Sequence, residues 1–150
     1  MALVAALALM SASLAMANEP VYLPAEPLVV ETAGGKTISF NAEIADDDAK
    51  RSHGMMFRRD MQDSEAMLFV WPEPYEAAMW MRNTYIPLDM LFIAPDGRIV
   101  YIARETVPHS LDVISAGQKV LAVMEIKGGA SARLGIAEGD HVRHRAFGGK

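Results

Sequence analysis

The chain has 150 residues, of which 51% are hydrophobic, and a formal net charge of −5 at pH 7. This length fits one domain, and the acidic balance argues against nucleic-acid binding, which usually needs a basic face. The absence of cysteine from the sequence excludes disulfides, a catalytic thiol, zinc–thiolate sites and lipidation at cysteine.

The first 17 residues, MALVAALALMSASLAMA, are apolar apart from two serines and end in Ala15-Met16-Ala17. Signal peptidase accepts small residues in this arrangement, so the sequence predicts a signal peptide over 1–17 with cleavage before Asn18. A membrane span needs about 20 apolar residues, more than this run provides. The positive charge usual at the start of a leader is missing. We therefore expect a periplasmic or secreted protein with no membrane span after the leader is removed.

After the leader, we expect an extended lead-in over 18–27, which contains three prolines, and a single globular β-rich domain over 28–146. The domain begins with two apolar runs, 28–31 and 37–45, on either side of a pair of glycines. Such a pattern predicts a β-hairpin. In the second run apolar and polar residues alternate, so one face of that strand should be buried and the other wet.

A helix is predicted after the hairpin, with Asp46 or Asp47 as its N-cap. Gly54 either ends this helix or permits close packing. Arg51 and Arg58 are seven residues apart, which would place them on one side of a helix that spans both. A solvated helix face and a clamp for a carboxylate or phosphate both fit this spacing.

Short apolar runs separated by proline and glycine turns make up the rest of the domain. The run at 66–71 predicts a strand that Pro72 and Pro74 end. The runs that follow predict a three-stranded meander over 77–81, 89–93 and 98–104, a strand over 119–126, one or two helical turns over 128–135 and a last strand over 141–145.

These elements predict a mainly β (α+β) fold, a small antiparallel β-barrel or half-barrel with one or two short helices. Two of the predicted strands, 66–71 and 89–93, are apolar almost throughout. Strands of this kind are covered on both faces, so a helix or loop should pack outside the sheet.

Polar side chains gather at the bend between the strands predicted at 77–81 and 89–93. A tryptophan offers a flat apolar face with one N–H donor, and asparagine and threonine offer directional hydrogen bonds. We expect a small polar or amphipathic ligand, either a small molecule or a peptide, to bind here, with the 51–58 segment above it. The predicted ligand-binding residues are Arg51, Arg58, Trp80, Arg82, Asn83, Thr84 and Asp89.

Other interpretations of the same residues stay open. Trp80 also suits a core position, and Asn83 also suits a left-handed turn. Asp89 shares a predicted strand face with aliphatic side chains, where an unpaired carboxylate is costly. It can accept backbone N–H bonds from the loop, pair with an arginine such as Arg82, or face a ligand. In the last case Asp89 would act as general acid or base, tuned by Arg82, in a hydrolase-like enzyme.

Seven methionines fall between positions 55 and 90, and Met79 and Met81 would share one strand face. Thioethers select Cu(I), so a methionine-based Cu(I)-binding protein is a further alternative to adaptable core packing. The sequence has no zinc-ligand spacing, no phosphate-binding glycine loop and no nucleophile motif. It therefore predicts no cofactor and no metal beyond that alternative, and it leaves catalysis and oligomeric state open.

Several segments resemble the domain-of-unknown-function family 192. They are RSHGMMFR (51–58), AMLFVW (66–71), MWMRNTYIPLDMLFI (79–93), the PDGRIV that follows, and LGIAEGDHV near the end. The family most often has lysine at the position of Arg82 and leucine at that of Met55. The resemblance implies a compact, mainly β domain that is often exported in bacteria, and it implies no established activity.

Overall fold

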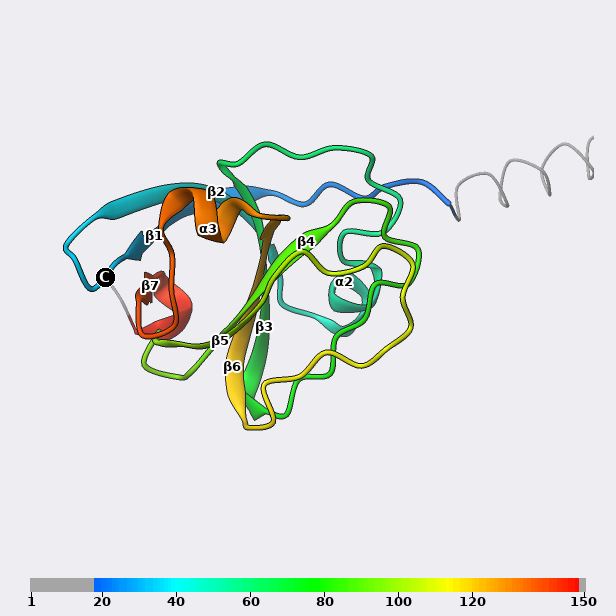
Figure 1. The fold of residues 1–150 in the computed structure, drawn as a ribbon. Coiled ribbons are helices and arrows are strands. Elements are labelled where there is room, and N and C mark those ends of the chain that lie inside the picture. Colours follow the sequence, from blue (N-terminus) through cyan, green and yellow to red (C-terminus); the bar gives the residue numbers. More distant parts are fainter. Residues whose placement is uncertain (1–17, 149–150) are drawn as a thin grey trace, which may run out of the picture.

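A computed structural model describes residues 18–148, so the predicted signal peptide over 1–17 lies outside the described residues. The described chain forms one curled seven-stranded sheet with short helices on either side of it (Figure 1). The strands are β1 (Ala25–Glu31), β2 (Thr37–Ala45), β3 (Glu65–Tyr75), β4 (Leu88–Ile93), β5 (Ile99–Ala103), β6 (Val120–Lys127) and β7 (His141–Arg143). The helices are α2 (Asp48–His53), α3 (Ala130–Leu134) and the 3-10 helix η1 (Arg145–Phe147).

The sheet has the order β5-β4-β6-β3-β2-β1-β7. All neighbours are antiparallel except β2 and β3, which run parallel because α2 and the segment after it carry the chain back across the sheet. The edge strands meet at one end of the curl, where Ile99 donates its N–H to the Asp140 carbonyl and Val142 donates to the Gly97 carbonyl, both at 2.8 Å. The predicted mainly β half-barrel with one or two short α-helices is confirmed.

Residues 66–69 of β3, strand β4 and most of β6 are buried on both faces. The apolar runs at 66–71 and 89–93 predict this for β3 and β4. On β4, Leu91 and Ile93 face the first core, inside the curl, whereas Met90 and Phe92 face the second core on the opposite side. The second core is covered by α2 and by irregular segments from 55–61, 77–81 and 104–116 (Figure 1). It includes Met55, Met61, Met67, Phe69, Met79, Met81, Met90, Phe92 and Val123.

The predicted hairpin and helix cap are confirmed. Strands β1 and β2 pair antiparallel across the glycine turn, although β1 begins at Ala25, inside the predicted lead-in. The N-cap of α2 is Asp47, whose carboxylate accepts the Lys50 N–H at 2.8 Å. The helix ends at Gly54, which has a positive φ of 50°.

Two of the strand predictions are wrong. Pro72 and Pro74 do not end β3, because β2 pairs with it only as far as Phe69 and the pairing with β6 is interrupted between Val70 and Tyr75. The two prolines therefore lie where no ladder N–H is required. The run at 77–81 forms only an isolated bridge between Met79 and Ile114. Both edges of strand β4 are already paired, one with β5 and one with β6, so residues 77–81 cannot pair with it. Of the predicted three-stranded meander, only the β4–β5 hairpin is present.

Gly97 is expected to be intolerant of alanine because a Cβ there would lie 2.5 Å from the Val142 carbonyl oxygen. Gly35 has a similar positive φ, but a Cβ added to it would meet no atom within 4 Å. Each alanine should lose about 1–2 kcal/mol to the left-handed backbone, and Gly97→Ala about 1–3 kcal/mol more to the clash. Urea denaturation of both variants measures the difference, and equal stabilities would contradict the tight junction of β7 with the β4–β5 turn.

Candidate functional site

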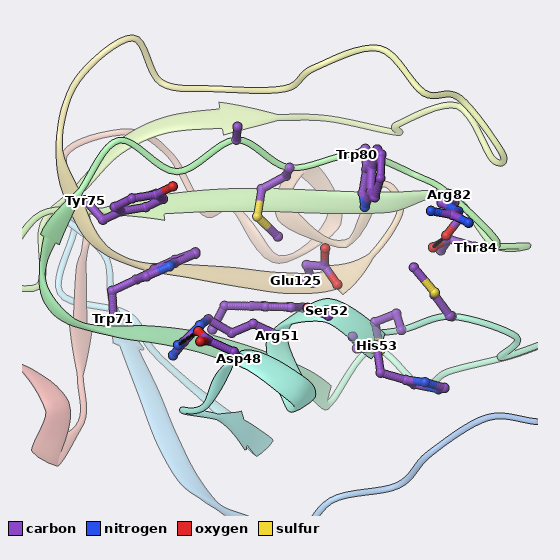
Figure 2. A pocket seen from close by; sticks show the side chains of 16 residues that line it. Asp48, Arg51, Ser52, His53, Trp71, Tyr75, Trp80, Arg82, Thr84 and Glu125 are labelled. Atoms are coloured by element: carbon purple, nitrogen blue, oxygen red, sulfur yellow. Dashed lines mark hydrogen bonds and ion pairs between the residues drawn. The ribbon is translucent and has the colours of Figure 1, made fainter. Parts of the chain in front are cut away.

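A cleft of about 360 Å³ opens on the side of the second core. One wall is α2 with the turn after it, the opposite wall is the irregular segment 78–84, and the far half of β3 closes one end. Figure 2 shows the side chains of α2 across the cleft from Trp80, Arg82 and Thr84, with Glu125 between the two walls. The irregular cover of the second core therefore leaves a hollow over the sheet.

Glu125 projects from β6 into this cleft and is 4% exposed. Its register partners on the neighbouring strands are Met67 and Met90, so its carboxyl lies among apolar side chains. The Oε2 atom has no hydrogen-bond partner within the described chain. Burial raises the pKa of Glu125 to about 8, although the positive charge of Arg58 acts in the opposite direction. At pH 7 most of the molecules therefore carry an uncharged Glu125.

Two arginine–aromatic pairs flank the cleft. The Arg51 guanidinium lies 5.7 Å from the centroid of the Trp71 ring, and that of Arg82 lies 5.5 Å from the Trp80 ring. Arg51 is held in place, since it donates to the Val70 carbonyl at 2.6 Å and to the Asp48 carboxylate at 2.7 Å. Arg82 is exposed and makes no ion pair with any residue of 18–148. Its charge is therefore available to a bound molecule.

Thr84 and His53 add polar groups to the walls. Thr84 is buried, lines the cleft and donates its hydroxyl to the Arg82 carbonyl at 3.1 Å. The Nε2 atom of His53 is buried without a hydrogen-bond partner among the residues that the structure covers. Burial, and next the charge of Arg58, lower the pKa of His53, so the ring is uncharged at neutral pH.

Of the predicted site residues, Arg51, Trp80, Arg82 and Thr84 line the cleft, and Arg58, Asn83 and Asp89 do not. Asn83 has a positive φ of 53° and forms a left-handed turn, and its carbonyl accepts the Phe57 N–H at 2.8 Å. Its side-chain amide lies 3.9 Å from the Met56 sulfur. Asn83 thus joins the bend to the segment that follows α2.

The sequence predicted a helix that could include Arg58. The observed helix α2 ends at His53, so Arg58 lies outside it. Its guanidinium, 4% exposed, donates to both carboxylate oxygens of Glu43, at 2.6 and 2.7 Å, and to the Val21 carbonyl at 2.6 Å. It also lies 4.4 Å from the centroid of the Tyr22 ring. The prediction that Arg51 and Arg58 share one helix side is wrong, and Arg58 instead fastens the N-terminal segment to β2.

Asp89 is fully buried on the first-core face, where it receives four hydrogen bonds. The donors are the N–H groups of Glu105, Gly129 and Ser131, at 2.8–3.0 Å, and the Ser131 hydroxyl at 2.6 Å. Burial alone would raise the pKa of Asp89, but these bonds outweigh it and hold the pKa below the ordinary value. Asp89 does not pair with Arg82. Asp89 was expected to accept backbone N–H bonds, pair with an arginine or face a ligand, and the structure supports the first of these.

Comparison with known proteins identifies the family. Residues 29–144 match the family described as Uncharacterized ACR, DUF192. The chain belongs to the DUF192 family. No curated protein matches the chain.

Two crystal structures are similar to this DUF192 chain. One, from Sinorhizobium meliloti 1021, is 40% identical, covers 84% of this chain and 98% of its own, and superposes with a TM-score of 0.81. It carries the conjectural description of a transcription regulator. The other, a protein of unknown function from Novosphingobium aromaticivorans, is 39% identical, covers 83% of this chain and 92% of its own, and has a TM-score of 0.78.

Neither a metal cluster nor a membrane helix occurs in the described part of this DUF192 chain. Residues 18–148 contain no group of three or more histidines, aspartates or glutamates placed to hold a metal ion. None of their helices has the length and apolar character to cross a membrane. Met79 lines the cleft, whereas the Met81 sulfur is buried and accepts the Thr106 hydroxyl at 3.1 Å. The methionine-based Cu(I) site stays a prediction.

Sequence reasoning missed the residues at the floor and end of the cleft, namely Glu125, Trp71 and Tyr75. A signal for Glu125 was present, because it is the single acidic residue in the apolar run KVLAVMEI. Trp71 and Tyr75 stack on each other with centroids 5.7 Å apart, next to the prolines that were expected to end β3. These two rings gave no signal because the strand was expected to stop before the second of them.

Replacing Asp89 with alanine should lower the free energy of unfolding by about 3 kcal/mol, since buried donors lose their acceptor. The pKa of Asp89 is lowered in the folded state, so its stabilisation is present above its ordinary pKa and is lost as the pH falls through the folded-state value. Urea denaturation at a series of pH values tests both statements. Asp112→Ala, at an exposed position, is the control and should change stability by less than about 0.5 kcal/mol.

Proposed function

We propose that this DUF192 domain is exported and binds a small amphipathic ligand in the cleft between α2 and the 78–84 segment. The observation that carries the proposal is a concave site that combines aromatic rings, two guanidinium groups and a buried carboxyl group without a partner. A polar group left buried and unpaired costs stability, so its place in an open cleft favours a role toward another molecule.

The size and lining of the cleft suit a small molecule. Its volume of about 360 Å³ lies in the lower part of the range of ligand pockets, about 300–1,000 Å³. Trp80 is 46% exposed although it is large and apolar, so a ring lying on it would remove that surface from water. Arg82 and Thr84 stand on the same wall and supply a charge and a hydroxyl group.

The hydrolase-like alternative, in which Asp89 acts with Arg82, does not fit the position of Asp89. The Asp89 carboxylate is enclosed by the groups that bond to it and is absent from the lining of the cleft. A general acid or base must reach the proton that it transfers. Asp89 is therefore not placed to transfer a proton to or from a ligand in this cleft.

Replacing Trp80 with alanine should abolish ligand binding with little loss of stability, because the side chain is half exposed and its removal opens no interior cavity. A screen of ring-containing fragments by ¹H–¹⁵N NMR first identifies a ligand through shifts at residues of the cleft. The affinity of both variants for that ligand is then measured by the same method.

The matched control is Tyr101→Ala, which removes an aromatic ring of similar exposure on β5, away from the cleft. Binding should survive in the control. Unchanged binding in the Trp80 variant, or a screen in which shifts never concentrate at the cleft, would contradict the proposed function.

Export predicts that the mature protein begins at Asn18. Expression of the full chain in a Gram-negative host, followed by fractionation and intact-mass measurement, should give periplasmic protein that lacks residues 1–17. Ala17→Arg places a large charged residue before the cut and should leave the leader attached. Cytoplasmic protein of full mass from the unaltered chain would contradict export without bearing on the cleft.

A further inference from the structure

We infer that the cleft selects small ring-containing organic anions, and that Glu125 binds them as an uncharged carboxyl group that donates a hydrogen bond. The inference rests on the proposed function, since it names the chemical class of ligand for the same cleft. Its basis is the placement of a proton-bearing side chain at the floor of the cleft, below two fixed positive charges on its walls (Figure 2).

The charges that line the cleft favour an anion. Arg51 and Arg82 contribute two positive charges, and Asp48, whose side chain is fully exposed at the rim, contributes one negative charge. With Glu125 and His53 uncharged, the lining has an excess of one positive charge, in contrast to the net −5 of the whole chain. Arg51 already pairs with the Asp48 carboxylate, whereas Arg82 has no such partner in the described chain. Arg82 is therefore the guanidinium available to pair with a ligand carboxylate.

The described surroundings of Glu125 provide no hydrogen-bond donor that would hold it ionised. Its neighbours across the sheet are Met67 from β3 and Met90 from β4. The charged or titratable groups that face the cleft from the other elements are Asp48, Arg51, His53, Tyr75 and Arg82, and Arg58 acts from behind the lining. None of them donates a hydrogen bond to Glu125 in the described structure, and Oε2 is left without a partner.

Arg58 is the one cation whose charge bears on Glu125. Both of its terminal nitrogens are taken by Glu43, and one also by the Val21 carbonyl. Its charge is thereby largely balanced by Glu43, in a pair with 4% and 13% side-chain exposure. Burial among apolar side chains consequently dominates at Glu125, and the proton stays on the carboxyl group.

The protonation state decides what Glu125 can recognise. A protonated carboxyl has one O–H donor, whereas an ionised one only accepts hydrogen bonds and would repel an anion. A ligand ammonium group would be repelled by the two guanidinium groups on the walls. It could form an ion pair with Glu125 only after that carboxyl group had lost its proton. A ligand carboxylate or another strong acceptor gains both the O–H donor below it and the charge of Arg82 beside it. The ring of the ligand then packs against the aromatic side chains of the cleft walls.

Three probes that share one ring and differ in charge test this selection: benzoate, benzyl alcohol and benzylamine. Their affinities are measured at pH 7 from ¹H–¹⁵N NMR shifts of the cleft residues. Benzoate should bind best, benzyl alcohol more weakly and benzylamine least. Preference for benzylamine, equal binding of all three, or no cleft shifts up to the solubility limits would each overturn the inference. Equal binding would leave the proposed function standing, and the fragment screen decides that function separately.

The role of the proton is tested by repeating the benzoate titration at pH 9. With a pKa of about 8, roughly one molecule in ten keeps the proton at that pH, so the affinity of the natural protein should fall about tenfold from its low-pH value. Glu125→Gln, which keeps an N–H donor at every pH, should bind benzoate equally at pH 6 and pH 9. Glu73→Gln removes an exposed carboxylate outside the cleft and should retain the tenfold loss.

A measurement on the unaltered protein makes the test independent of how well the Gln variant folds. The ¹³C signal of the Glu125 carboxyl is followed through pH with and without benzoate. Because benzoate binds the protonated form, it should raise the pKa of Glu125, and benzylamine should not. A benzoate affinity that does not vary with pH, or a pKa of Glu125 that falls when benzoate binds, would overturn the inference.

Discussion

The structure depends on the burial of three central strands, β3, β4 and β6, on both of their faces. A sheet with two apolar faces needs two covers. The first cover is the sheet itself, which curls until β7 meets the β4–β5 turn, together with α3. The second cover is built from α2 and irregular segments, which fill the opposite face less regularly (Figure 1). The cleft lies within this second cover, over β6, with Glu125 beneath it.

The two carboxyl groups buried in the sheet have opposite surroundings. Asp89 projects into the first core and has its hydrogen bonds satisfied by the N-terminal end of α3 and by Glu105. Glu125 projects from the neighbouring strand to the other face, where methionines surround it and no donor reaches Oε2. The first group serves the fold, and the second is the group that the proposed ligand would meet. Burial alone therefore does not distinguish these two acids, whereas the satisfaction of their hydrogen bonds does.

Sequence patterns predicted the elements whose signals are local. The β1–β2 hairpin, the Asp47 cap of α2 and strand β6 follow from turn residues, capping and apolar runs. The placement of 77–81 could not be predicted in this way, because it depends on which strands pair with β4, and β6 is distant in sequence. The same limit applies to the site. Trp80, Arg82 and Thr84 could be predicted as a site because they are close together in sequence. Glu125 is far from them in sequence and lies beside them only because of the strand order in the sheet.

The two cores differ in the stiffness of their side chains. The first is made largely of leucine, isoleucine and valine, whose branched side chains have few rotamers, together with alanine, which has none. Methionine, which is unbranched and polarizable, supplies six positions of the second: Met55, Met61, Met67, Met79, Met81 and Met90. The side chains of the first core thus have few alternative rotamers. Those of the second core, which borders the cleft, have more, and this favours repacking around bound molecules of different shape. Under the proposed function, such a site would accept a chemical class rather than one compound, with charge as the selective feature and shape as the tolerant one.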